Sequence, residues 1–170
     1  MASDRPTTKI IAGKYKGKIL ELPSLDVTRS SKARLKESLF NVLQFDIIDK
    51  IFIESFAGSG SIGLEAISRG AKRAYFVELD RNSYQILLKN CKAVDMEKCQ
   101  TVQGNTFVQT PLFINFLKNS QDEIVLYIDP PFDYRDGMED IYDKSFTMIK
   151  NIEVDNIYMI IVEHFSSLEM

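Results

Sequence analysis

The chain has 170 residues, of which 45% are hydrophobic and 26% are charged, and its net charge is −3. This composition is typical of a soluble globular protein with one main domain. The sequence has neither an apolar run of about 18 residues nor a signal-peptide pattern, so we expect a cytoplasmic protein that does not enter a membrane. Cys91 and Cys99 are the only cysteines, too few for a structural zinc site, and we expect reduced thiols and no bound metal.

Charge is distributed unevenly along the chain. Residues 5–36 contain nine basic and two acidic residues, a net charge of +7, whereas the chain from residue 37 onward has twelve basic and twenty-one acidic residues, a net charge of −9. A basic segment on an acidic body is typical of a surface that meets phosphate groups. We therefore expect residues 1–45 to form a basic extension that faces phosphate groups, ahead of a main domain over residues 46–170.

Residues 9–22 predict two short strands around a turn at residues 13–17, with Lys14, Lys16 and Lys18 alternating along one side. These lysines are candidates for contacts with a phosphate backbone. The alternative is that they protect an exposed sheet edge from aggregation.

A helix is predicted over residues 31–45, where apolar residues recur at helical spacing. Lys32 and Lys36 fall on the opposite, polar side. We expect this helix to pack on the main domain and to present its polar front, including Arg29, to the site. Its apolar set is Leu35, Leu39, Phe40 and Leu43.

A strand, a glycine-rich loop and a helix follow. The strand at residues 52–56 leads into Gly58-x-Gly60-x-x-Gly63, whose glycines let a ligand come close to the backbone and to the N–H groups of the helix N-terminus. The next strand, at residues 73–78, ends at Glu78, twenty residues after Gly58. An acidic residue at this position is expected to hydrogen-bond ribose hydroxyls.

Two kinds of ligand fit this loop. A dinucleotide would make the protein an NAD-type oxidoreductase, but the chain has no Tyr-x-x-x-Lys pair, and its only histidine, His164, lies six residues from the end. S-adenosylmethionine is the other ligand, because its adenosine and amino-acid ends need the same acidic residue and backbone amides but no pyrophosphate cradle.

Helices are then predicted over residues 81–94 and 109–118, with a strand at residues 99–103 between them. Asn105 follows this strand, where its amide could accept from and donate to an adenine edge or could simply belong to a turn. The core side chains of the second helix are expected to be Phe113, Phe116 and Leu117.

The stretch at residues 124–128 is apolar throughout, as expected for a central strand buried on both faces of a parallel sheet. Asp129-Pro130-Pro131-Phe132 follows at its carboxyl end. The prolines have no N–H and stiffen the turn, so a carbonyl and the Asp129 carboxylate form an acceptor-only site that suits the exocyclic NH2 of a nucleobase. Phe132 can stack on that base. An isolated Asp-Pro is more often only a turn.

Residues 133–140 are polar and acidic and predict a loop that closes over the site, followed by a helix at residues 138–149 and a strand at residues 157–162.

Strands that alternate with helices indicate an α/β fold with a doubly wound, mostly parallel sheet. Such sheets bind ligands at the carboxyl ends of the strands, where the strand order reverses. The glycine loop of the first strand and Asp129 of the fourth are then neighbours.

Four segments in fixed order resemble those of one known family. They are Ile10-Ile11-Ala12-Gly13-Lys14-Tyr15-Lys16-Gly17, Arg34-Leu35-Lys36-Glu37-Ser38-Leu39-Phe40-Asn41, Phe56-Ala57-Gly58-Ser59-Gly60 with the helix that follows it, and Asp129-Pro130-Pro131-Phe132. The chain resembles, over nearly its whole length, the bacterial RsmD family of 16S rRNA (guanine-N2)-methyltransferases. The resemblance implies a Rossmann-like class I methyltransferase fold, S-adenosylmethionine as methyl donor, and a guanine of 16S rRNA in an assembling small ribosomal subunit as target.

The resemblance also implies roles for individual residues in a monomeric enzyme. The acceptor base would be held by Asp129, Pro130, Pro131 and Phe132. The cofactor would be held by Glu54, Phe56, Ala57, Gly58, Ser59, Gly60, Glu78, Leu79, Asn105 and Thr106. RNA would be held by Lys14, Lys16, Lys18, Arg29, Lys32 and Arg34.

The chain departs from the family pattern in several places. Glu54 stands where Asp is usual, and Asn105 stands where an acidic residue is usual. Only six residues follow His164, so the closing antiparallel hairpin is expected to be incomplete. Two further functions stay open: methylation of another planar amine, such as adenine N6 in RNA or DNA, and a non-catalytic RNA-binding assembly factor that retains the cofactor fold.

Overall fold

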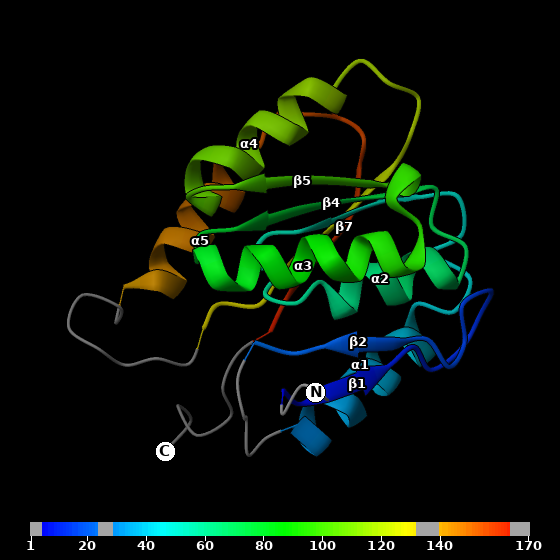
Figure 1. The fold of residues 1–170 in the computed structure, drawn as a ribbon. Helices are drawn as coiled ribbons and strands as arrows, with labels where there is room; N and C mark the ends of the chain where they lie inside the picture. Colours follow the sequence, from blue (N-terminus) through cyan, green and yellow to red (C-terminus); the bar gives the residue numbers. More distant parts are fainter. Residues whose placement is uncertain (1–4, 24–28, 132–139, 164–170) are drawn as a thin grey trace, which may run out of the picture.

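The computed structural model describes residues 5–23, 29–131 and 140–163. Figure 1 shows a central sheet with helices on both faces and a two-stranded hairpin beside one helical layer. The elements in chain order are β1 (Thr7–Lys9), β2 (Ile19–Glu21), α1 (Arg29–Val42), β3 (Ile51–Glu54), α2 (Ser61–Ser68), β4 (Arg73–Glu78), α3 (Arg81–Val94), the 3-10 turn η1 (Met96–Lys98), β5 (Cys99–Gln103), α4 (Thr106–Leu117), β6 (Ile124–Ile128), α5 (Ile141–Lys150) and β7 (Ile157–Val162).

The central sheet has five parallel strands in the order β5-β4-β3-β6-β7. Strand β3 pairs with β4 on one side and β6 on the other, so Glu54 at its end is level with Phe76 and Tyr127. The strand order reverses between β3 and β6, which places their carboxyl ends side by side at a switch point. The predicted doubly wound α/β fold is confirmed, as is the predicted neighbourhood of the glycine loop and Asp129.

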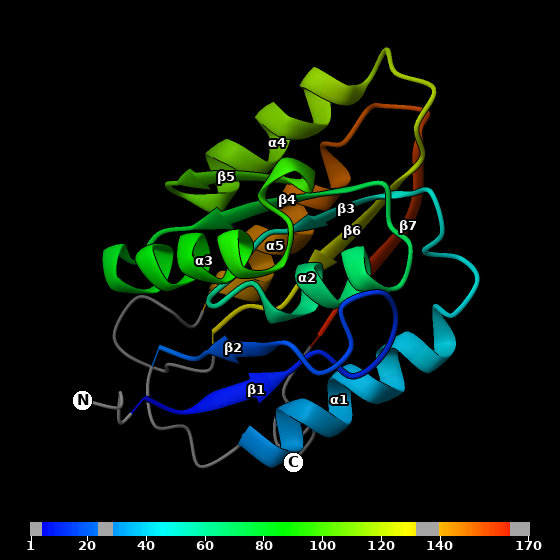
Figure 2. The ribbon, with the colours of Figure 1, turned by 45° about the vertical axis from the view of Figure 1, so that its right-hand side comes forward.

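Each face of the sheet has its own hydrophobic core. Helices α1, α2 and α3 and the β1-β2 hairpin cover one face (Figure 2), where Phe40 and Phe52 are completely buried. Helices α4 and α5 cover the other face, where Ile114 and Met148 are buried against the sheet. The hairpin contributes Ile10 to the first core. The amino-terminal segment therefore packs against the main sheet through this hydrophobic core.

Helix α1 differs from the prediction in the side chains that it buries. Phe40 is buried as expected, but Leu35 is 39% exposed. Lys36, which was expected on the polar side, is only 2% exposed. The reason lies beneath the helix, where the carboxylate of Glu65 in α2 is 3.5 Å from the Lys36 ammonium. The prediction assumed an apolar surface beneath α1 and was wrong for these two side chains.

Two other segments also differ from the prediction. Strands β1 and β2 have three residues each, so Lys14, Lys16 and Lys18 lie in the loop between them and do not alternate along a strand. Helix α4 begins earlier than predicted, because the Asn105 side chain caps it by accepting a hydrogen bond from the Phe107 N–H. Phe116 on this helix is 78% exposed, so its predicted place in the core was wrong.

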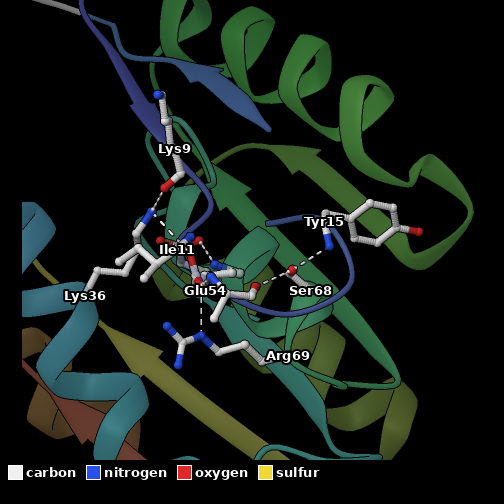
Figure 3. Close-up of polar contacts among 10 residues, drawn as sticks. Lys9, Ile11, Tyr15, Lys36, Glu54, Ser68 and Arg69 are labelled. Carbon is white, nitrogen blue, oxygen red and sulfur yellow. Dashed lines mark hydrogen bonds and ion pairs between the residues drawn. The ribbon is translucent and has the colours of Figure 1, made fainter. Parts of the chain in front are cut away.

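A buried polar cluster joins the amino-terminal segment to α2 (Figure 3). The completely buried Glu65 carboxylate accepts hydrogen bonds from the Ile11 N–H at 2.9 Å and the Ala12 N–H at 3.1 Å. It also pairs with the guanidinium of Arg69 at 2.8 Å and with Lys36. Burial lowers the pKa of Lys36, and the Glu65 carboxylate opposes that change. The charged groups and the peptide N–H donors together offset the free-energy cost of burying the Glu65 carboxylate.

Within the part of the chain that the structure describes, no helix is long and apolar enough to cross a lipid bilayer. No group of His, Cys, Asp and Glu side chains in that same part is placed to hold a metal ion. Cys91 and Cys99 are free and buried.

We expect Glu65→Ala to lower the free energy of unfolding by about 3–5 kcal/mol, because removing one partner leaves a buried charge and peptide groups uncompensated. Urea unfolding measures this loss. The matched control is Glu123→Ala, whose side chain is 54% exposed and 3.6 Å from the Lys50 ammonium; an exposed pair contributes at most about 1 kcal/mol. Equal losses in the two variants would contradict the role given to Glu65.

Candidate active site

Four adjacent strands each carry an acidic residue at their carboxyl ends. Glu54 ends β3, Glu78 ends β4, Asp129 follows β6 and Glu163 follows β7. Glu54 is buried and the other three are partly buried. The Glu163 N–H donates to the Ile128 carbonyl at 2.9 Å, which carries the β6-β7 pairing up to the level of Asp129. This carboxyl edge is therefore negatively charged and suits a cationic ligand.

The glycine loop between β3 and α2 depends on two residues with positive φ. Gly58 has a φ of 56° and Gly60 a φ of 82°, values that favour glycine. The Gly58 N–H donates to Oε1 of Glu78 at 2.7 Å, and the Asp80 N–H donates to Oε2 at 2.8 Å. Glu78 thus holds the loop to the end of β4. A carboxylate has further lone pairs, which can accept hydrogen bonds from ribose hydroxyls.

Gly63, the third glycine of the motif, lies directly against the sheet. A Cβ at this position would be 2.3 Å from Cε1 of Phe76. The Gly63 N–H donates to Oε1 of Glu54 at 3.0 Å. Any side chain at Gly63 would push α2 away from β3 and β4, and the start of the helix would no longer lie against the carboxyl edge.

The pKa of Glu54 is strongly shifted at this edge. Burial raises the pKa of Glu54 well above its ordinary value, the Gly63 N–H lowers it, and the carboxylates of Asp129 and Glu78 raise it further. A positively charged group among these carboxylates would lower that pKa and would be attracted by them.

The acceptor motif follows β6 directly. Asp129 is partly buried, Pro130 is buried and Pro131 is exposed. Phe132 and the predicted closing loop up to residue 139 lie outside the described residues. The structure thus places the carboxylate and the first proline of the motif beside the glycine loop of β3.

Sequence reasoning missed two residues at this end of β6 and β7. The buried Tyr127 hydroxyl has no hydrogen-bond partner among the described residues. Burial raises the pKa of Tyr127, and the carboxylates of Asp129, Glu163 and Glu54 raise it further, so the hydroxyl stays protonated. Glu163 is the second residue that the sequence analysis did not identify. Its position and that of Tyr127 could have indicated them, because both residues lie at or near the ends of strands that the sequence predicted.

The remaining residues of the glycine loop are mostly held within the protein. Ala57 and Ser59 are buried, and the Ser59 carbonyl accepts a hydrogen bond from the Asn90 side chain at 2.9 Å. The ring of Phe56 packs edge-on against that of Phe107, with centroids 5.9 Å apart. Leu79, directly after Glu78, is 69% exposed, which leaves its side chain open to a ligand.

Asn105 and Thr106 have structural contacts of their own. The Asn105 Oδ1 accepts from the Phe107 N–H at 2.8 Å. The buried Thr106 hydroxyl donates to the Ser55 carbonyl at 2.5 Å. These contacts fix the start of α4 beside the end of β3, and direct adenine recognition by these two residues stays a prediction.

The basic candidates lie on the hairpin and α1 side of the sheet. Lys14, Lys16, Lys18 and Arg34 are exposed. The side chains of Arg29 and Lys32 lie outside the described part of the structure. The loop that carries the exposed lysines contacts Ser68 at the carboxyl-terminal end of α2, whereas Glu54 of the acidic edge contacts Gly63 near the amino-terminal end.

We expect Glu54→Gln to change how stability depends on pH. Glutamine can still accept from the Gly63 N–H but does not titrate. Because the pKa of Glu54 is raised, the folded protein binds more protons than the unfolded chain between the ordinary value of 4.5 and the folded value. The wild type should therefore gain stability over the variant as pH falls through this interval. Urea unfolding of both proteins from about pH 8 to about pH 4 tests this; a constant difference would contradict it.

Two curated relatives carry the name ribosomal RNA small subunit methyltransferase D. The protein from Haemophilus influenzae is 38% identical over 129 residues, which cover 74% of this chain and 64% of that protein. The protein from Escherichia coli K12 is 34% identical over 125 residues, which cover 73% of this chain and 60% of that protein. The chain thus spans less than two thirds of the length of either relative.

Solved structures share the fold. The Escherichia coli protein yhhF matches with a TM-score of 0.67 and 29% identity, over 97% of this chain and 84% of that chain. The hypothetical protein TTHA0928 from Thermus thermophilus matches with a TM-score of 0.60 and 26% identity, over 83% of this chain and 78% of that chain.

The family comparison extends over nearly the whole sequence. The model of a family described as Conserved hypothetical protein 95 matches residues 8–170, a range that includes the basic loop, the glycine loop and the Asp-Pro-Pro motif. On this match, and on the similarity to the two curated methyltransferases, the chain belongs to the RsmD family.

Proposed function

We propose that this protein transfers a methyl group from S-adenosylmethionine to the exocyclic N2 amine of a guanine in 16S rRNA. The observation that carries the proposal is the pairing of β3 with β6, which puts a glycine loop for the donor beside Asp129 and Pro130 for the acceptor. Membership of the RsmD family supports RNA methylation. The choice of guanine N2 rests on the resemblance of the Asp-Pro-Pro-Phe motif to that of the RsmD family, because an acceptor-only site suits any exocyclic NH2 group, that of adenine included.

The glycine loop and the acidic edge suit S-adenosylmethionine. The open space beside Gly58 would allow the methionine end to come close, and Glu78 would accept from the ribose hydroxyls. The cofactor is a sulfonium and carries an ammonium group. The carboxylates of Glu54, Glu78 and Asp129 would attract these positive charges.

Asp129 and Pro130 would prepare the amine for attack. The nitrogen lone pair of a guanine amine is delocalised into the ring, so the amine is a weak nucleophile. The Asp129 carboxylate and the Pro130 carbonyl would accept its two hydrogens and leave the lone pair directed at the methyl carbon. S-adenosylmethionine would supply the methyl group and leave as S-adenosylhomocysteine, and the nitrogen, positively charged after the transfer, would lose a proton to Asp129 or to water. Phe132 would stack on the base after it leaves the helix stack.

The basic extension over residues 1–45 would hold the RNA, and residues 46–170 would carry the transfer chemistry. Lys14, Lys16, Lys18 and Arg34 are exposed on it, and phosphate contacts of this kind make affinity fall steeply with salt. We propose a monomer that acts on an assembling small ribosomal subunit.

We expect labelled methyl from S-adenosylmethionine to enter 16S rRNA of unmethylated small-subunit particles, and Asp129→Ala to slow this transfer at least about 100-fold. The slower rate follows from the loss of an acceptor that acts on the reacting amine. Nucleotide mapping of the product identifies the base. Parallel reactions with naked 16S rRNA show whether the assembled particle is needed.

The matched control is Asp155→Ala, an exposed aspartate in the turn before β7, which should leave the rate unchanged. Cofactor affinity of each variant, measured by calorimetry, separates loss of chemistry from loss of the donor. Transfer to adenine N6 would contradict the guanine assignment. No transfer by a protein that binds the cofactor would contradict the enzyme assignment and favour an RNA-binding assembly factor.

A further inference from the structure

The basic loop between β1 and β2 is held by the backbone of helix α2 and by two of its side chains. Glu65 and Ser68 lie about one helical turn apart in α2, and Figure 3 shows Ser68 in contact with the loop. Both carboxylate oxygens of Glu65 accept hydrogen bonds from successive loop peptides, those of Ile11 and Ala12. The carboxylate is completely buried, so water does not compete for these bonds.

Ser68 makes a second set of contacts one turn further along. Its carbonyl accepts from the Lys14 N–H at 2.8 Å, and its hydroxyl accepts from the Tyr15 N–H at 2.9 Å. The same hydroxyl donates to the Ala12 carbonyl at 2.6 Å. Gly13 has a φ of 91°, and a Cβ on it would lie 2.0 Å from the Ser68 carbonyl oxygen. The loop backbone therefore follows one path against the helix.

The side chains of the loop are left open by this arrangement. Lys14 and Lys16 are exposed, while the Tyr15 hydroxyl donates to Asp95 at 2.8 Å and anchors the far side of the loop. The Lys14 ammonium lies 5.4 Å from the centre of the Tyr15 ring. A loop that is already ordered loses less conformational entropy on binding than a mobile one.

Helix α2 also links this loop to the cofactor loop. The helix begins at Ser61, directly after the glycine loop, and ends at Ser68. Eight helical residues span about 12 Å, and the Gly63 N–H fixes the first half of the helix to Glu54. One short helix therefore sets the distance between the exposed lysines and the donor site.

We propose that Ser68 and Glu65 are positioning residues, which hold Lys14 and Lys16 in a fixed arrangement for the RNA phosphate backbone at a set distance from the methyl donor. The inference rests on the proposed RNA-binding function and goes beyond it, because neither residue contacts the RNA. Both act through the backbone of the loop.

A double-mutant cycle between Ser68 and the two lysines tests the proposal. RNA affinity is measured for the wild type, Ser68→Ala, Lys14→Ala/Lys16→Ala and the triple variant. Ser68→Ala should weaken RNA binding about threefold to tenfold in the wild-type background and less than about twofold in the variant without the two lysines. The slope of log affinity against log salt should become shallower in Ser68→Ala, as it does when phosphate contacts are lost.

Steady-state kinetics of methyl transfer provide a second test of the proposal. In Ser68→Ala, KM for the RNA should rise by the same factor as the dissociation constant, while kcat at saturating RNA and the affinity for S-adenosylmethionine stay unchanged. The matched control is Ser120→Ala. Its hydroxyl also donates to a backbone carbonyl, that of Leu117, and accepts from a backbone N–H, that of Asp122, but it lies between α4 and β6.

Two outcomes would overturn the proposal. One is an equal effect of Ser68→Ala with and without the lysines, which would mean that the serine acts on general stability. The other is an unchanged RNA affinity in Ser68→Ala or in the lysine variant. Gly13→Ala, which displaces the loop from the same carbonyl, should reproduce the Ser68→Ala pattern. Methyl transfer by the wild type is scored separately, so failure of the cycle leaves the proposed enzyme activity intact, and absence of transfer leaves the binding cycle interpretable.

Discussion

The parallel pairing of β3 with β6 is the constraint on which the site depends. It brings together two segments that are about 70 residues apart in the sequence, the glycine loop after Glu54 and the Asp129 motif after Ile128. Because parallel strands end at the same edge of a sheet, both candidate segments meet there. The strands are buried and regular, whereas most candidate site residues lie where the strands end or just beyond. This division lets a rigid sheet position residues that must remain accessible.

A second constraint is the buried carboxylate of Glu65. It joins three parts of the chain, because its donors come from the hairpin loop, from α1 through Lys36 and from its own helix through Arg69. A buried carboxylate is tolerated only when its lone pairs are used. The amino-terminal segment is therefore fixed to α2 by polar contacts as well as by Ile10 in the shared hydrophobic core. Its position relative to the glycine loop follows from this attachment.

The charges are arranged as the proposed reaction requires. Acidic side chains gather at the carboxyl edge, where burial and mutual repulsion raise the pKa of Glu54, and exposed lysines gather on the hairpin loop. A cationic donor is attracted to the first surface and a polyanion to the second. The net charge of −3 for the whole chain does not reveal this separation of acidic and basic surfaces. Helix α2 lies between the two surfaces: its Gly63 N–H contacts Glu54 at the acidic edge, and Ser68 at its other end contacts the basic loop.

The sequence by itself determined the strands, the doubly wound order, the glycine loop and the neighbourhood of Asp129, because apolar periodicity and the rule of parallel connections are local or topological properties. The tertiary structure alone decided what faces each helix. It buried Lys36, exposed Phe116, used Asn105 as a cap and gave Glu65 and Ser68 the basic loop to hold. A helical pattern shows which residues share a face, but the chemistry of that face is set by the element packed against it, and that element comes from a distant part of the chain.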